Sequence, residues 1–371
     1  MRLCFFCYTP FHVFNAINVK NCLYPNDEAD LCLFNGVYGK TDILHNRLAE
    51  TRIFNEVFYL ENVWWAPETR IEKFLRKRVH IKSNKKIKNA YKNYRILKKR
   101  KRKCIYDEVW SYGSAMEMYI ILGLSLKRNP NTKYLGYEEG EGSYRLPCTN
   151  VLKDEEKAFI SNHLKLKMPE QPEKMLLYLP LCASSIVTCK IEQMPKVSKQ
   201  LVDEVYSRVW DFNEALLAFD VFLMASGGND QSFSFSIYNK LKSNDSISIA
   251  VKPHPRFTEP FNGKDVELLK CGTVPWEIVC GKIDNLDSKL LIGVYSTALV
   301  TAKSLYGLEP YIIFLNDMDT LNEKQRISSE MKAFLETFIQ TYSDQSKLFF
   351  PKNMDELIEC INNWYNRERL R

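Results

Sequence analysis

The sequence predicts an α/β protein built from two Rossmann-like domains whose parallel sheets face a central cleft. Its 371 residues are enough for two domains. Short apolar runs alternate with helical patterns from the N-terminus to about residue 137, which is typical of a doubly wound, mostly parallel sheet. The same alternation starts again near residue 200, after a stretch with several prolines and mixed charge. We therefore expect an N-terminal domain over 1–155, a connecting region over 156–200 and a C-terminal domain over 201–371.

The first half has five apolar runs of strand length, separated by segments with helical patterns. Thr9 is an expected N-cap, because Pro10 follows it at the first position of a helix. The expected strands cover 3–8, 29–34, 57–60, 105–110 and 133–137, and the expected helices cover 11–19, 41–51 and 116–126.

The second half repeats this organisation. The expected strands cover 220–224, 247–252, 289–294 and 311–315. The expected helices cover 200–218, a segment from about 231, a short segment opening at 274–277, 298–306 and two segments that finish the chain.

The composition is that of a globular protein of a reducing compartment. Eleven cysteines are scattered without a disulfide framework. Cys4 and Cys7 form a CxxC motif inside an apolar run, which favours core packing over metal or redox chemistry. The sequence has no signal-peptide pattern and no apolar run near the roughly 20 residues that a membrane span needs. We expect a cytoplasmic protein.

The net charge of +7 comes from one segment. Arg70 to Lys103 holds 17 Lys/Arg and one acid, while the remaining residues carry 35 bases and 44 acids. Three interpretations stay open: a solvated helix, an arm for nucleic acid, or a membrane-surface patch. The apolar spacing within 74–97 predicts a folded helix. We favour attachment to the inner face of the cytoplasmic membrane, because cations near anionic lipid are stabilising. No helix-turn-helix, zinc or RNP signature supports nucleic-acid binding.

The most informative stretch is Ile247 to Arg256, read as ISIAVKPHPR. A β-branched run ends at Lys252, and the turn that follows holds His254 between Pro253 and Pro255. Ligands of open α/β sheets bind at the carboxyl ends of strands. Lys252 and His254 make this end cationic, which suits a phosphate. The alternative is a structural proline turn with a surface histidine.

Three other strand ends or helix starts in the second half fit a nucleotide. Gly227, Gly228 and Asn229 form a turn that can bring backbone N–H groups to a ligand, although a lone Gly-Gly is a weak signal. Glu277 opens a helix, where it suits two ribose hydroxyls or simply the helix dipole. Ser296 and Thr297 precede a helix, where they form an anion site, a plain N-cap, or both. Together these groups favour a nucleotide site.

In the first half, Glu138, Glu139 and Gly140 follow a strand. Partial burial of adjacent carboxylates raises a pKa, which suits a general base near neutral pH. The alternative is a solvated acidic turn, because Glu141 continues the run. Asp317 and Asp319 form a late DxD that we interpret as a surface turn and not as a metal site.

These motifs, in this order, resemble those of the bacterial lipooligosaccharide sialyltransferase family, with the capsule polysialyltransferases close behind. The opening CYTPFH is similar to the family's Cys-x-Thr-Pro-Leu-Gln start. The acidic-acidic-Gly motif and the blocks VKPHPR, VPWE and IGVYSTAL resemble later family motifs in order and spacing. The match runs from near residue 1 to about residue 315.

The resemblance implies a GT-B fold, CMP-sialic acid as the donor, inversion at the anomeric carbon, and no metal or other cofactor. It implies the following roles: Glu139 as the base, His254 on the leaving phosphate, Ser296 and Thr297 on the same phosphate, Glu277 on the ribose, and Thr9 and His12 near the acceptor. Beside these, we place Lys252, Pro255, Gly227, Gly228 and Asn229 around the donor and Glu138 near the acceptor. The family more typically has Asp at the base position and Gln at the position of His12. Whether Glu138 or Glu139 is the base therefore stays open.

The sequence-based hypothesis is an inverting sialyltransferase that acts on a terminal galactose of lipooligosaccharide or capsular polysaccharide. A polysialyltransferase, or a related transferase that uses a UDP-hexose, is the alternative within enzymes. A basic nucleic-acid-binding protein is the alternative outside them.

Overall fold

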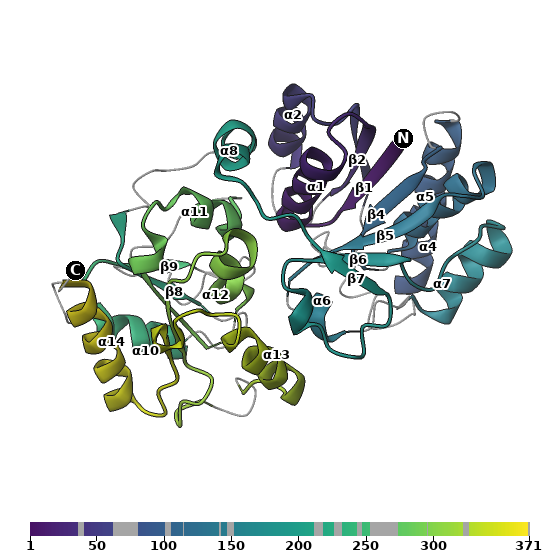
Figure 1. Ribbon diagram of the computed structural model, residues 1–371. Coiled ribbons are helices and arrows are strands. Elements are labelled where there is room, and N and C mark those ends of the chain that lie inside the picture. Colours follow the sequence, from purple (N-terminus) through teal and green to yellow (C-terminus); the bar gives the residue numbers. More distant parts are fainter. Residues whose placement is uncertain are drawn as a thin grey trace. The chain divides into compact units, whose positions relative to one another are not determined.

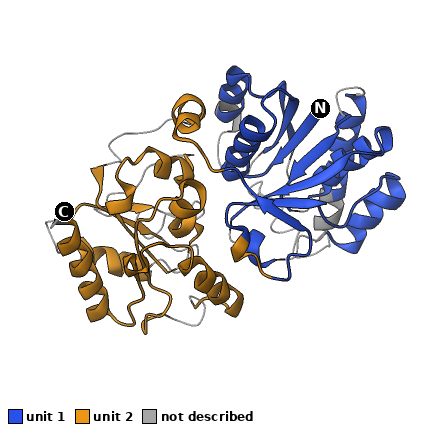
Figure 2. Cartoon of the chain, viewed as in Figure 1, with its two compact units in different colours: residues 1–180, 185–195 blue, residues 181–184, 196–371 orange. Residues whose placement is uncertain are grey.

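The computed structural model describes residues 1–35, 41–61, 81–100, 105–113, 115–140, 142–146, 152–210, 218–225, 232–242, 247–252, 274–294, 296–321 and 326–369. The chain divides into two compact units (Figure 2). The first holds residues 1–180 and 185–195, and the second holds residues 181–184 and 196–371.

The first unit contains a seven-stranded sheet in the order β3-β2-β1-β4-β5-β6-β7, in which every neighbouring pair is parallel (Figure 1). Its strands are β1 (Arg2–Cys7), β2 (Glu28–Asn35), β3 (Glu56–Glu61), β4 (Glu108–Ser111), β5 (Lys133–Tyr137), β6 (Lys174–Leu177) and β7 (Lys190–Gln193). Its helices and helical turns are α1 (Pro10–Leu23), α2 (Thr41–Thr51), α4 (Ile81–Lys99), α5 (Met116–Arg128), α6 (Gly142–Arg145), α7 (Asp154–Ala158) and η2 (Phe159–His163). The short turn η3 (Pro180–Cys182) lies where the chain passes from the first unit to residues 181–184 of the second.

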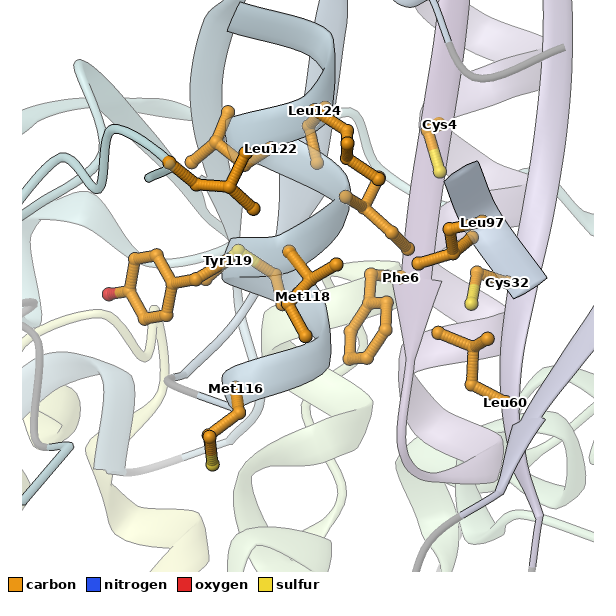
Figure 3. Close-up of a cluster of buried hydrophobic side chains, with 14 of the residues drawn as sticks. Cys4, Phe6, Cys32, Leu60, Leu97, Met116, Met118, Tyr119, Leu122 and Leu124 are labelled. Atoms are coloured by element: carbon orange, nitrogen blue, oxygen red, sulfur yellow. The ribbon is translucent and has the colours of Figure 1, made fainter. Parts of the chain in front are cut away.

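One core of the first unit forms where α4 and α5 pack on the sheet (Figure 3). Phe6 of β1, Leu97 of α4 and Met118 of α5 are each buried in it. Burying one such side chain stabilises the fold by about 1.5–3 kcal/mol. Cys4 lies in the same core, and burial raises the pKa of the neighbouring Cys7 thiol to about 12. The expectation that the CxxC motif serves core packing is therefore confirmed.

The second unit contains a five-stranded sheet in the order β12-β11-β10-β8-β9, again with parallel neighbours. Its strands are β8 (Val221–Met224), β9 (Ile249–Lys252), β10 (Leu290–Gly293), β11 (Tyr311–Phe314) and β12 (Leu348–Phe349). Its helices and helical turns are α8 (Lys199–Leu201), η4 (Val202–Tyr206), α9 (Ser207–Val209), α10 (Ser232–Lys242), α11 (Trp276–Lys282), η6 (Leu286–Ser288), α12 (Thr297–Thr301), η7 (Ala302–Tyr306), α13 (Ser329–Ile339), η9 (Gln345–Lys347) and α14 (Met354–Arg369).

Each sheet has a point where the strand order reverses. In the first, β1 lies between β2 and β4, and in the second, β8 lies between β9 and β10. Ligands of doubly wound sheets bind outside the carboxyl ends of the strands at such a point. The carboxyl edge of each sheet is therefore the place to look for functional groups.

The region 156–200 differs from the sequence-based expectation. We expected it to connect the domains, but it completes the first sheet, since β5 pairs with β6 and β6 pairs with β7. The prolines lie in the loops around two four-residue strands that are too short to show a clear pattern. The first unit ends at Pro195.

Two smaller differences concern the second unit. The helix expected over 200–218 is broken by the wider turn η4 after three residues of α8, and residues 211–217 lie outside the described part of the chain. The two-residue strand β12 was not expected, because only its pairing with β11 defines it. Within the described ranges, no helix has the length and apolar character to cross a membrane.

Candidate functional site

The turn after β1 is held by two hydrogen bonds that both involve His12. Thr9 caps α1, because its hydroxyl accepts from the His12 backbone N–H at 3.2 Å. The His12 Nδ1 accepts from the backbone N–H of Tyr8, the residue before the cap, at 3.1 Å. The third helical residue therefore also fixes the chain that enters the helix, one position earlier than in a capping box, where it would accept from the cap itself. The sequence-based prediction of a cap at Thr9 is confirmed.

His12 supports this turn from the inside of the first unit. Its side chain is 1% exposed, and burial lowers the pKa of the imidazole to about 3. The ring is therefore neutral near pH 7, and since Nδ1 accepts a hydrogen bond, the proton sits on Nε2. That nitrogen has no hydrogen-bond partner among the described residues, and the imidazole ring packs edge-on against the rings of Tyr8 and Tyr137. Thr9 is only half-buried, so it is the more accessible of the two.

The acidic turn after β5 separates its two carboxylates. Glu138 is 2% exposed, and its Oε2 accepts from the Tyr178 N–H at 2.8 Å and from the Tyr144 hydroxyl. Glu139 is exposed, and its backbone N–H donates to the Ser143 hydroxyl at 2.8 Å. The sequence alone could not tell these neighbours apart, but the structure encloses the Glu138 side chain and exposes that of Glu139.

Gly140 makes this turn possible. Its φ is +133°, in the region that side chains disfavour, so the chain reverses directly after Glu139. The Ser143 N–H then donates to the Gly140 carbonyl at 3.0 Å, which closes the turn.

The Thr9 turn and the acidic turn lie on the same edge of the first sheet. They follow β1 and β5, which flank β4 in a parallel sheet. Asn15 of α1 donates to the Glu138 carbonyl at 2.6 Å, so the helix that begins at Thr9 is bonded directly to the acidic turn. The fold thus places Thr9, Glu138 and Glu139 on one edge of the first sheet.

In the second unit, a basic and an acidic group meet at the carboxyl edge of the sheet. Lys252 is the last residue of β9, and Glu277 is in the first turn of α11. Burial raises the pKa of the Glu277 carboxyl, and the positive charge of Lys252 offsets part of that rise. The charge of Lys252 therefore acts on the Glu277 carboxyl, although 25 positions separate the two residues in the sequence.

The start of α12 lies beside them. The Trp276 indole N–H donates to the Ala298 carbonyl at 2.9 Å, which holds the first turns of α11 and α12 together. Ser296 caps α12 by accepting from the Ala298 N–H at 3.2 Å, and Thr297 is the first helical residue. Four predicted donor residues therefore lie on one edge: Lys252, Glu277, Ser296 and Thr297. An ammonium and a helix start suit a phosphate, and a carboxylate suits hydroxyl donors.

Several predicted site residues lie outside the described ranges and stay predictions. These are His254 and Pro255 after β9, and Gly227, Gly228 and Asn229 after β8. Residues 70–80 and 101–103 of the basic segment also lie outside them.

Asp317 and Asp319 lie on the turn after β11. Both are exposed, while Met318 between them is buried in the core of the second unit. The Asp319 backbone N–H donates to the Lys352 carbonyl at 2.8 Å. This is the expected surface turn. In the part of the chain that the structure describes, no three His, Cys, Asp or Glu side chains are grouped as a metal site would require.

Sequence reasoning missed the residues that surround Glu138. Tyr144 and Tyr178 bind its carboxylate, and Asn15 binds its carbonyl. Tyr178 lies in the region that we took for a connection, so no pattern in the sequence pointed to it.

Comparison with known proteins identifies the fold. No family model matches the sequence, and no curated protein matches it. The structure of the glycotransferase of kitacinnamycin is similar with a TM-score of 0.53 and 8% identity, over 98% of this chain and 90% of that one. Arabidopsis thaliana UGT89C1 complexed with UDP is similar with a TM-score of 0.53 and 6% identity, over 100% of this chain and 92% of that one.

The fold is of the GT-B type. At these identities the likeness concerns the path of the chain alone. It confirms the predicted class, which is two Rossmann-like units with parallel sheets.

Proposed function

We propose that this protein is a glycosyltransferase that uses a nucleotide sugar as its donor. The observation that carries the proposal is the edge of the second sheet, where Lys252, Glu277 and the start of α12 gather on a GT-B fold. These groups match the two polar parts of a nucleotide, because the cation and helix start suit the phosphate and the carboxylate suits the ribose. Binding of UDP by the similar UGT89C1 structure is consistent with a nucleotide.

Within that class, we propose that the enzyme is an inverting sialyltransferase that takes CMP-sialic acid and a terminal galactose of lipooligosaccharide or capsular polysaccharide. The ordered motifs of the sequence support this choice. The acceptor hydroxyl oxygen forms a bond to the anomeric carbon while the bond from that carbon to the phosphate oxygen breaks. CMP leaves with the bonding electrons, and Glu139 takes the proton of the acceptor hydroxyl. The exposure of Glu139 and the burial of Glu138 favour Glu139 for this role.

The departing phosphate gathers negative charge as its bond to the sugar breaks. We assign its stabilisation to Lys252, His254 and the helix start at Ser296. Groups that are already oriented toward developing charge lower the barrier without further reorganisation. General base help from a carboxylate is typically worth about 10²–10⁴-fold.

The test is thermal stabilisation by CMP, UMP, UDP and AMP, with and without a divalent cation. A nucleotide at 100 times its dissociation constant stabilises by about 2.7 kcal/mol. We expect CMP to raise the melting temperature with and without chelator. A shift with UDP and metal alone would replace the sialyltransferase proposal by a UDP-hexose transferase, and no shift with any nucleotide would reject both.

A matched pair of variants locates the nucleotide. Glu277→Gln removes the carboxylate charge in the first turn of α11, and Glu330→Gln does the same in the first turn of α13. We expect about tenfold weaker CMP binding for Glu277→Gln, because a hydrogen bond to a charged group is worth about 1.5–3 kcal/mol. Equal affinity in both variants would contradict the placement of the ribose.

We also propose that α4 rests on an anionic membrane surface. The exposed side chains of its described part include Lys88, Lys92, Arg95, Lys98 and Lys99, and no acidic residue occurs between 81 and 100. Tyr91 and Ile96 are also exposed, at 42% and 41%. A cation near anionic lipid contributes about 1 kcal/mol, and exposed apolar groups add insertion into the interface.

Vesicle sedimentation tests this surface. We expect binding to phosphatidylcholine vesicles that contain 30% phosphatidylglycerol, and none to phosphatidylcholine alone. Replacing Lys88, Lys92 and Arg95 by Gln should abolish it, while the same change at Lys133, Lys153 and Lys165 should not. Equal loss in both triple variants would refute a role for α4, and tighter binding to RNA or DNA than to vesicles would favour the nucleic-acid alternative.

A further inference from the structure

We infer that Glu138 is a positioning residue, and that a buried hydrogen-bond network centred on Tyr178 ties the acidic turn to the point where the chain leaves the first unit. This inference rests on the proposed role of Glu139. It gives a role to side chains that sequence reasoning did not single out, namely Asn15, Asn18, Tyr144 and Tyr178.

The Glu138 end of the network holds both the side chain and the backbone of that residue. Its Oε2 accepts from the Tyr178 N–H at 2.8 Å and from the Tyr144 hydroxyl. The Tyr144 hydroxyl in turn accepts from the Leu179 N–H at 3.2 Å. The Glu138 carbonyl accepts from Asn15 at 2.6 Å. Glu138 therefore binds the end of β6, α6 and α1 at once, and its carboxylate is occupied within the fold.

The Tyr178 hydroxyl extends this network across α1. It donates to the Asn15 Oδ1 at 2.8 Å and accepts from the Asn18 Nδ2 at 3.1 Å. The Asn18 Nδ2 also donates to the Pro195 carbonyl at 2.7 Å. Pro195 is the last residue of the first unit, and Lys196 begins the long continuous part of the second. The Tyr178 hydroxyl therefore connects, through Asn15 and Asn18, the acidic turn to the point where the chain leaves the first unit.

A second route joins the same two places through the backbone. The Gln193 side chain donates to the Tyr178 carbonyl at 2.7 Å, and the Met194 N–H donates to the Leu177 carbonyl at 2.8 Å. The segment from β7 to Pro195 is therefore attached to the same residues that hold Glu138.

Burial makes this network stiff. Asn15 and Asn18 are 0% exposed, and Glu138, Tyr144 and Tyr178 are each 2% exposed. Buried polar groups that lose their partners are costly, because water cannot replace the lost bond. The members of such a network also reinforce one another. The acidic turn and the chain exit are therefore expected to keep one arrangement, and to loosen together.

For the proposed reaction, the network fixes the direction in which the Glu139 carboxylate points. Its backbone follows Glu138 directly, and Gly140 and Ser143 fix the other side of the turn. Glu138 therefore sets where the Glu139 carboxylate stands relative to an acceptor hydroxyl. A displacement of about 1 Å at a reacting group costs about 10²-fold in rate.

The first experiment compares three variants by kcat and KM. We expect Glu139→Gln to lose about 10²–10⁴-fold in kcat as a base would. Glu138→Ala should lose about 10²-fold in kcat with the donor KM unchanged. Glu138→Gln should stay close to wild type, because the amide oxygen still accepts from Tyr144 and Tyr178. A Glu138→Gln variant as inactive as Glu139→Gln would overturn the positioning role.

The second experiment needs no activity, so it remains informative if the enzyme transfers another sugar. Tyr178→Phe removes one hydroxyl, and we expect amide hydrogen exchange to speed up about tenfold both in 138–146 and in 193–198. Tyr106→Phe is the matched control, because that buried hydroxyl donates to Asp30 at 2.9 Å beside the opposite edge of the same sheet. It should leave both segments unchanged. Faster exchange in only one segment, or in neither, would refute the coupling.

Discussion

The buried neutral His12 predicts a specific loss of stability in weak acid. Its ring is enclosed, its Nδ1 is occupied by the Tyr8 N–H, and burial lowers its pKa to about 3 from an ordinary value of 6.5. The unfolded chain protonates this imidazole below pH 6.5, whereas the folded chain does not until about pH 3. The unfolded state therefore binds one more proton through this window, and the free energy of unfolding falls as the pH falls.

The size of the effect follows from the two pKa values. One pH unit inside the window is worth about 1.4 kcal/mol for one proton. Between pH 7 and pH 5 the unfolded imidazole changes from mostly neutral to mostly charged, while the folded one stays neutral. Integration over this interval gives a loss of about 2 kcal/mol that is due to His12.

Urea denaturation at pH 7 and pH 5 measures this loss, with His12→Asn as the reference. Asn cannot titrate, and its side-chain oxygen can take the place of Nδ1 as the acceptor for the Tyr8 N–H. We expect the variant to be less stable at both pH values, because a buried ring is lost. Its loss of unfolding free energy between pH 7 and pH 5 should, however, be smaller than that of the wild type by about 2 kcal/mol. Parallel pH profiles for the two proteins would show that His12 is protonated in the folded state.

Two further predictions concern the local structure around the site. Thr9→Ala should lower the free energy of unfolding by about 1 kcal/mol, because it removes the cap of α1, while Thr9→Ser should retain it; equal stability of the two in chemical denaturation would contradict the capping role. Gly281→Ala should lower the free energy of unfolding by about 1–3 kcal/mol, because the new methyl carbon would lie 2.6 Å from the Tyr306 hydroxyl. That hydroxyl donates to the Glu277 carbonyl, so the variant should also bind nucleotide more weakly in a thermal-shift assay. Gly142→Ala is the control, because its methyl group would meet nothing closer than 3.5 Å.

Patterns within short segments identified most of the elements. The strand at 133–137 and the helix at 41–51 have the predicted bounds, and the cap at Thr9 is as expected. These features depend on local chemistry, namely apolar runs, a capping hydroxyl and a proline with a fixed φ. The region 156–200 could not be assigned in this way, because β6 and β7 are strands only through their pairing with β5.

In the candidate site too, the sequence predicted individual residues, and the tertiary structure showed which of them lie together. The sequence indicated Lys252, Glu277, Ser296 and Thr297 one at a time, each at a strand end or helix start. Their grouping depends on the parallel order of the second sheet and on the bond from Trp276 to Ala298, which joins two helices 22 positions apart in sequence.

The sequence by itself determined the two-unit α/β class, the capped turn at Thr9 and the presence of two adjacent acids after a strand. Local periodicity and residue type are enough for these features, because each depends on neighbours within a few positions. Only the tertiary structure decided that Glu138 is enclosed and Glu139 exposed. That distinction depends on Tyr178, which lies 40 residues away from Glu138 and reaches it through β6. Burial and hydrogen bonding of this kind depend on contacts between segments that are far apart in the sequence. The residues next to Glu138 and Glu139 therefore could not predict which of the two is enclosed.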